Sequence, residues 1–231
     1  MRILYFDPIG GISGDMILAA LIDLGVSVDH LKRNLRFVKG SEMKVGRAIR
    51  QGVSARTVRF NIGKPIKEKQ FLPLIKESKL SPRIKSRAVA IVQRIFAVEK
   101  KIHHAQHLHL HELADADTIL DIVGALVGID YLKVDKVFSR PVKVGSGLIK
   151  TSEGPMPAFN FATAELLKGF PIHFLPVQAE LTTPTGAAII SSITTPNENF
   201  IMSRIERIGL GAGSMEIDGH PNILRVFLGD S

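Results

Sequence analysis

The fold is decided by residues 3–25, which read ILYFDPIGGISGDMILAALIDLG. Residues 3–7 are apolar enough to form a buried strand, and the apolar run from Asp15 to Leu24 has the length of a helix. Glycine and serine fill the turn between them, and Gly25 is placed to end the helix. This order predicts an α/β protein in which helices pack on a mixed sheet, with a mixed α+β arrangement as the alternative.

Helical and strand-like patterns continue to the end of the chain. We expect a short helix that ends near Leu35, capped by Ser27 or Asp29, and a helix that begins at Ser81 and Pro82. Further helices are expected over 118–131, 162–168 and 187–193, the first with Asp117 as its N-cap. Expected strands cover two or three segments within 43–62, then 137–147, 172–177, 200–208 and 222–228, with a glycine-rich bend over 209–213.

The composition is that of a globular chain. Its 231 residues are 45% hydrophobic and include no cysteine, so any bound metal must be held by nitrogen and oxygen ligands. We expect one domain over 1–231, with an inserted antiparallel and helical segment at about 40–102. No signal peptide or membrane span is recognisable, so the cytoplasm is the expected location.

The net charge of +8 comes from one segment of the chain. Residues 64–101 hold eleven lysine and arginine residues against three glutamates, which accounts for the whole excess. Interleaved aromatic residues and nucleic-acid-binding motifs are missing from this segment. We therefore expect a solvated helix face or an anionic small-molecule partner rather than nucleic acid.

A histidine-rich segment carries the strongest chemical signal. His107, His109 and His111 alternate with leucines, which places three imidazoles on one face of a strand, and Glu112 follows at once. Imidazole is a common ligand of borderline metals such as nickel and zinc. The spacing alone fits a specific metal site or an unspecific histidine surface equally well. We favour His109, His111, Glu112 and Asp117 as ligands over His103, His104 and His107.

Two further segments contain candidate ligand-binding groups. The turn at Gly10 to Asp15 can cradle a phosphate at a helix N-terminus, although it lacks the lysine of a Walker loop. Asp7 and Asp15 either serve the fold, Asp15 by suiting the helix dipole, or contact a metal or substrate. The hydroxyls of Thr182, Thr183 and Thr185 are placed to cap a helix or to bind phosphate or carboxylate oxygens.

Five ordered blocks together resemble the nickel insertion proteins of nickel-pincer cofactor biosynthesis. The blocks are Tyr5-Phe6-Asp7 with residues 11–16, His109 to Glu112 with Asp117 and residues 119–124, residues 162–169, residues 180–188, and residues 221–226. They span almost the whole chain in the family's order.

The resemblance implies a nickel chelatase of the lyase class. Its substrate would be pyridinium-3,5-bisthiocarboxylic acid mononucleotide, and its product the nickel-pincer cofactor of lactate racemase and related racemases. The family reaction uses CTP, held with Mg²⁺ or Mn²⁺ by a C-terminal domain. This chain is similar to the N-terminal part, so we expect a separate CTP-binding partner. No membrane partner is expected. An apo-racemase that receives the product and a homo-oligomer are both compatible with the sequence.

The chain departs from the family pattern at a few positions. Glu153 stands in place of a histidine, Phe159 and Phe161 stand in place of prolines, and Asp115 stands in place of a small residue. These changes bear on substrate contact and metal preference. Two other functions stay open: a nickel-storage protein or metallochaperone without catalysis, and a metal-dependent hydrolase.

The candidate residues fall into three groups. The metal ligands are expected to be His109, His111, Glu112 and Asp117. The catalytic acids and bases are expected among Asp7, Asp15, Asp117 and Asp121. The organic ligand is expected to contact Gly11, Ser13, Gly14, Thr182, Thr183 and Thr185.

Overall fold

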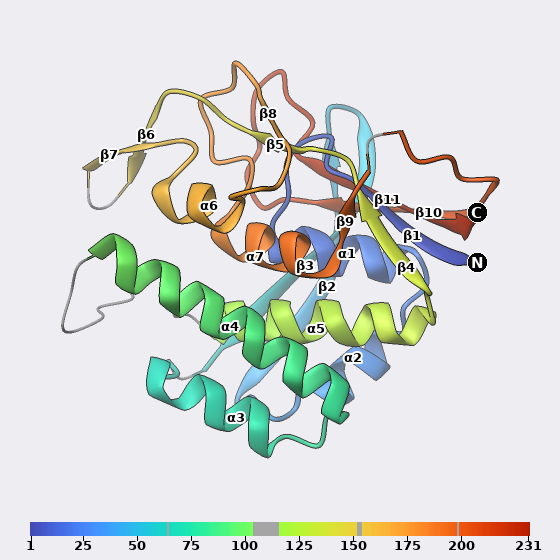
Figure 1. Ribbon diagram of the computed structural model, residues 1–231, viewed down its shortest axis with the longest axis vertical. Helices are drawn as coiled ribbons and strands as arrows, with labels where there is room; N and C mark the ends of the chain where they lie inside the picture. Colours follow the sequence, from blue (N-terminus) through green and yellow to red (C-terminus); the bar gives the residue numbers. More distant parts are fainter. Residues whose placement is uncertain (64, 104–115, 152–153, 198) are drawn as a thin grey trace.

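A computed structural model describes residues 1–63, 65–103, 116–151, 154–197 and 199–231. Its centre is a seven-stranded mixed sheet in the order β2-β3-β10-β11-β1-β4-β9 (Figure 1). These strands are β1 (Arg2–Asp7), β2 (Ser41–Arg50), β3 (Val53–Ile62), β4 (Lys136–Ser139), β9 (Thr195–Pro196), β10 (Arg204–Ala212) and β11 (Ile223–Asp230). The first and last strands pair antiparallel, so the two termini lie side by side.

Two smaller sheets lie outside the main one. Strand β5 (Val142–Val144) pairs parallel with β8 (Ile172–Phe174), and β6 (Leu148–Thr151) forms a hairpin with β7 (Gly154–Pro157). The expected strand over 137–147 is therefore wrong in its continuity, because it divides into β4 and β5. Pro141 lies at the break and has no amide proton to donate to a ladder.

The helices form layers on the sheet, as Figure 1 shows. They are α1 (Gly14–Asp23), α2 (Val28–Leu35), α3 (Phe71–Glu77), α4 (Pro82–His103), α5 (Ala116–Leu132), α6 (Phe161–Leu166) and α7 (Pro184–Ile193), with a short 3₁₀ helix at Glu68–Gln70. Helix α1 packs on the sheet, α5 on α1, and α4 on α5. The predicted α/β class, with a mixed sheet and helices packed on it, is confirmed.

The strand, turn and helix of residues 3–25 lie where the sequence places them. Almost all of α1 is buried, and the following Gly25 adopts the left-handed conformation with φ +102°. Gly209 and Gly211 lie within β10 rather than in the expected bend. A Cβ on Gly211 would overlap the carbonyl oxygen of Met16, so glycine lets α1 approach the sheet closely.

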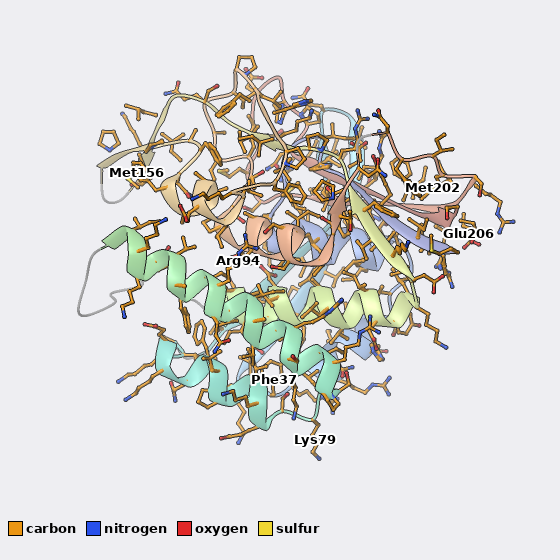
Figure 2. The ribbon with its side chains drawn as sticks, in the orientation of Figure 1. Phe37, Lys79, Arg94, Met156, Met202 and Glu206 are labelled. Carbon is orange, nitrogen blue, oxygen red and sulfur yellow. The ribbon has the colours of Figure 1, made fainter. Side chains whose placement is uncertain are left out.

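The segment at about 40–102 contributes to both layers. Strands β2 and β3 form one edge of the main sheet, α4 covers α5, and α3 packs on α4. The predicted apolar stripe of α4 is buried; its members are Ile84, Ala88, Ile91, Val92 and Ile95. From the same helix, Arg94 reaches toward α7 (Figure 2) and donates hydrogen bonds to the Ser191 hydroxyl, at 2.8 Å, and to the Leu166 carbonyl.

Most predicted helix starts are accurate. Ser27 caps α2 by accepting a hydrogen bond from the His30 amide, and Ser81 accepts one from the Ile84 amide at 3.4 Å. Asp117 is not the residue before its helix but lies in the first turn of α5. None of the helices in the described ranges is both long enough and apolar enough to cross a bilayer.

The variant Gly211→Ala is expected to lower the free energy of unfolding by about 1 to 3 kcal/mol, because the new methyl group must displace backbone atoms of α1. Chemical denaturation measures this change. The matched control is Gly46→Ala on exposed strand β2, where the Cβ meets only the Thr57 hydroxyl at 3.0 Å. The control should change stability by less than about 0.5 kcal/mol. Equal effects in both variants would contradict the close-approach argument.

Candidate functional site

A cavity of about 680 Å³ opens where four helices begin. The first residues of α1, α5, α6 and α7 all line it, together with the end of α4, part of β3, and the β6–β7 hairpin. Met156, labelled in Figure 2, lies on this hairpin and forms part of the wall. The volume lies in the range of small-molecule sites in proteins.

Carboxylates dominate the polar lining. Asp15 lies in the first turn of α1, and Asp117 and Asp121 lie one turn apart at the start of α5. Glu99 near the end of α4 is 5% exposed, and Glu180 precedes α7. Helix N-termini carry partial positive charge, so the first-turn positions of Asp15 and Asp117 offset part of the cost of gathering these acids.

The contact between Gly14 and Asp121 brings α1 and α5 together. A Cβ on Gly14 would overlap the Asp121 carboxylate, so only glycine permits this packing. Asp121 is 8% exposed, and its Oδ1 atom accepts no hydrogen bond from any described residue. A buried acceptor without a donor is rare in folded proteins and often marks a functional position.

The environment changes the acidity of two of these residues. Burial raises the pKa of Asp121 well above its ordinary value, and the nearby charges of Asp15 and Asp117 raise it further. Burial also raises the pKa of Asp15, although hydrogen bonds from the Ser13 hydroxyl and the Met16 amide lower it. A cation that enters this cavity is therefore favoured, because it relieves the repulsion that otherwise favours protonation.

Another part of the lining comes from α6, α7 and the residues before them. Asn160 caps α6 through its side-chain oxygen and donates a hydrogen bond to Glu180 Oε1 at 2.6 Å. Thr183 caps α7 by accepting a hydrogen bond from the Gly186 amide at 3.2 Å. Phe161 is 59% exposed, so the cavity has an aromatic wall beside its acidic one.

The structure brings most of the expected site residues together. Those that line the cavity are Ser13, Gly14, Asp15, Asp117, Asp121, Thr183 and Thr185. The expected metal ligands His109, His111 and Glu112 lie outside the described residues. Among the side chains that are described, no group of three or more histidines and acids is arranged to hold a metal ion.

Three expected residues do not line the cavity. Asp7 accepts hydrogen bonds from the Arg225 guanidinium, the shorter at 2.6 Å, and thereby links β1 to β11. Gly11 has φ +106° and lies against the Leu181 backbone. Thr182 is buried and donates a hydrogen bond to the Lys143 carbonyl at 2.6 Å. In these contacts all three hold the fold together.

Three of the cavity residues that sequence reasoning missed are informative. Glu99 continues the apolar stripe of α4 one turn after Ile95, so an acid on a buried helix face was a usable signal. Asn160 precedes a helix and has the side chain of a good N-cap. Arg59 lies on β3, and nothing in the local pattern distinguishes it from its basic neighbours.

Comparison with known proteins gives one consistent family description. Residues 4–231 match the family model described as nickel insertion protein. A protein of Clostridium kluyveri named pyridinium-3,5-bisthiocarboxylic acid mononucleotide nickel insertion protein is 39% identical over 250 residues, which cover 100% of this chain and 62% of the relative. A protein of the same name from Thermotoga sp. strain RQ2 is 37% identical, with 99% and 61% covered.

A protein of Geotalea daltonii, provisionally named a nickel insertion protein, is 38% identical over 100% of this chain and 62% of its own length. The chain thus spans about 60% of the length of the curated relatives that it matches. No solved structure matches it significantly.

The variant Asp121→Asn is expected to stabilise the protein at about pH 8 by about 1 to 3 kcal/mol, since it removes a buried charge without a donor. The pKa of Asp121 is higher in the folded protein than in the unfolded chain. Between these two pKa values the folded protein therefore binds more protons than the unfolded chain, and the stability of the native protein falls as the pH rises. The advantage of the variant should therefore vanish toward about pH 4.

Thermal unfolding at several pH values measures this dependence. The matched control is Asp130→Asn, an exposed position on the same helix. It should change stability by less than about 0.5 kcal/mol at every pH. A native protein that is most stable above pH 8, with no gain in Asp121→Asn, would contradict the description of this carboxyl.

Proposed function

Because this chain belongs to the nickel insertion protein family, we propose that it takes part in inserting nickel into pyridinium-3,5-bisthiocarboxylic acid mononucleotide. The observation that carries the proposal is the cavity lined by Asp15, Asp117 and Asp121, in a chain that matches the family over residues 4–231. Two relatives are named for this reaction. Both nickel and the mononucleotide are substrates of the proposed reaction.

The cavity suits the organic substrate in size and charge. About 680 Å³ is enough for a mononucleotide. The acidic wall attracts the positive ring nitrogen, and nickel offsets the charge of the two thiocarboxylates that the same wall repels. Met156 and Phe161 supply apolar surface for the flat ring. The hydroxyls of Ser13, Thr183 and Thr185 are available for oxygen or sulfur substituents.

We assign nickel binding to His109, His111, Glu112 and Asp117. Asp117 supports this assignment because it lines the cavity and lies in the first turn after the histidine segment. Imidazole and carboxylate ligands are of intermediate softness for nickel. They bind nickel less strongly than the sulfur groups of the organic substrate do, so the ion can pass to these softer ligands.

The proposed reaction also requires proton removal. Nickel bonds to a ring carbon, so the carbon–hydrogen bond breaks and its electron pair forms the nickel–carbon bond, while the proton goes to a base. Asp15 and Asp121 are the candidates that line the cavity beside Asp117, and burial raises the pKa of both. Asp7 is the weaker candidate because Arg225 already engages it.

The remaining parts of the reaction belong to a further region or partner. The relatives extend well beyond the share that this chain covers. We propose that CTP, with Mg²⁺ or Mn²⁺, is bound by that region, and that an apo-racemase receives the product. The same proposal places the reaction in the cytoplasm.

Reconstitution tests the proposed function. The chain is mixed with Ni²⁺, CTP, Mg²⁺, the bisthiocarboxylate mononucleotide and the region of a longer relative that lies outside the matched share, and mass spectrometry follows the nickelated product. We expect product only when both protein parts are present. If the Clostridium kluyveri protein forms product in parallel and the mixture does not, the proposal is wrong. Nickel binding without product would instead indicate a metallochaperone.

The double variant His109→Ala and His111→Ala is expected to weaken nickel binding by at least about 100-fold, because two ligands are lost. Isothermal titration with Ni²⁺ measures the dissociation constant. The matched control is His103→Ala with His104→Ala, which removes the same number of imidazoles from the same segment and should reduce only weak uptake. Equal affinity in native protein and the first variant would refute the ligand assignment.

A further inference from the structure

The charges around the cavity are arranged unevenly, and Arg59 is the exception to the acidic lining. It is the one lysine or arginine among the described residues that line the cavity. Its side chain is exposed on β3 and forms no ion pair within the part of the chain that the structure describes. The guanidinium thus faces a cavity without a partner of its own.

Arg59 is close enough to the acidic wall to affect it. Its charge lowers the pKa of Asp15, which places the guanidinium and that carboxyl in one electrostatic environment. Neighbouring arginines of the β2–β3 hairpin behave differently. Arg47 and Arg56 both pair with Asp23 at 3.3 Å and do not line the cavity. Among the described cations of this hairpin, Arg59 is therefore the one placed for a ligand.

We propose that Arg59 binds the phosphate of the mononucleotide and so makes the cavity prefer the nucleotide over the nucleoside. This inference rests on the proposed function, because it takes the pyridinium mononucleotide as the ligand. The ring portion carries one positive charge and two negative ones, whereas the phosphate carries up to two negative charges, so Asp15, Asp117 and Asp121 repel the phosphate end more strongly than the ring end. A guanidinium presents paired donors that match phosphate oxygens. The ligand therefore lies with its ring toward the acids and its phosphate toward β3.

The strand register supplies a matched control. Lys44 on β2 lies directly opposite Arg59 in the antiparallel ladder, is exposed, and does not line the cavity. Lys44→Gln removes the same charge from the same hairpin as Arg59→Gln. Any difference between the two variants reports on the cavity rather than on the general field of the protein.

The test uses ligands that cannot complete the reaction. The probes are pyridinium-3,5-dicarboxylic acid mononucleotide, in which oxygen replaces each sulfur, and its nucleoside without phosphate. Calorimetry in the absence of nickel gives both dissociation constants. In the native chain and in Lys44→Gln, the nucleotide should bind at least about 10-fold more tightly than the nucleoside. In Arg59→Gln this preference should fall below about 2-fold, with nucleoside affinity unchanged.

Several results would overturn the inference. Equal losses for nucleotide and nucleoside in Arg59→Gln would mean that Arg59 contacts the ring carboxylates. A preference that survives in Arg59→Gln but disappears in Thr185→Val would assign the phosphate to the start of α7. Failure of the native chain to bind the nucleotide also overturns it, even if nickel still binds. Loss of nickel insertion with an intact nucleotide preference would instead overturn only the proposed function.

Discussion

Close packing at the start of α1 is the constraint on which the cavity depends. A Cβ on Gly14 would overlap the Asp121 side chain, so the absence of a side chain at residue 14 lets the start of α1 pack directly on this carboxylate of α5. Gly186 in α7 lies equally close to the backbone of Ile12. A side chain at either position would separate these helix starts and widen the site. The sheet fixes the other side of α1, since β10 approaches it closely enough to touch its backbone at Gly211.

This packing explains how several acids share one site in a folded protein. Asp15 and Asp117 lie in first turns, where the helix dipole favours a negative charge. Asp121 lies deeper, and the structure leaves one of its oxygens without a donor. Proteins place such destabilised groups at functional positions and compensate for their cost elsewhere. Here the compensation is the buried apolar body of α1 and α5, which surrounds the polar ends of the same helices.

Much of this arrangement was predictable from local patterns. The turn at residues 10–15, the apolar run of α1 and the proline at the start of α4 each indicated an element that the structure contains. Asp15 and Asp121 were recognisable as acids near helix starts. The division between residues 137 and 147 was harder, because β4 and β5 join different sheets and only tertiary pairing decides that. Asp7 looked like a site residue until its pairing with Arg225, 218 positions away, was known. Arg59 gave no local signal for the same reason: its role depends on which elements fold against β3.

The proposed function requires one site to serve two very different substrates, and the two walls of the cavity suit that requirement. A divalent ion needs oxygen and nitrogen donors that give it up again, whereas a pyridinium mononucleotide needs a flat apolar surface and separate places for its positive and negative charges. The proposal assigns Asp117 to nickel, together with the histidine segment, and leaves Asp15 and Asp121 to act on the organic substrate and on its proton. In the proposed reaction nickel leaves for sulfur and carbon, so the acids would lose a neighbouring cation and their affinity for protons would rise. Proton uptake by the site and proton loss from the ring would then occur in the same step, and release of the metal would favour formation of the new bond.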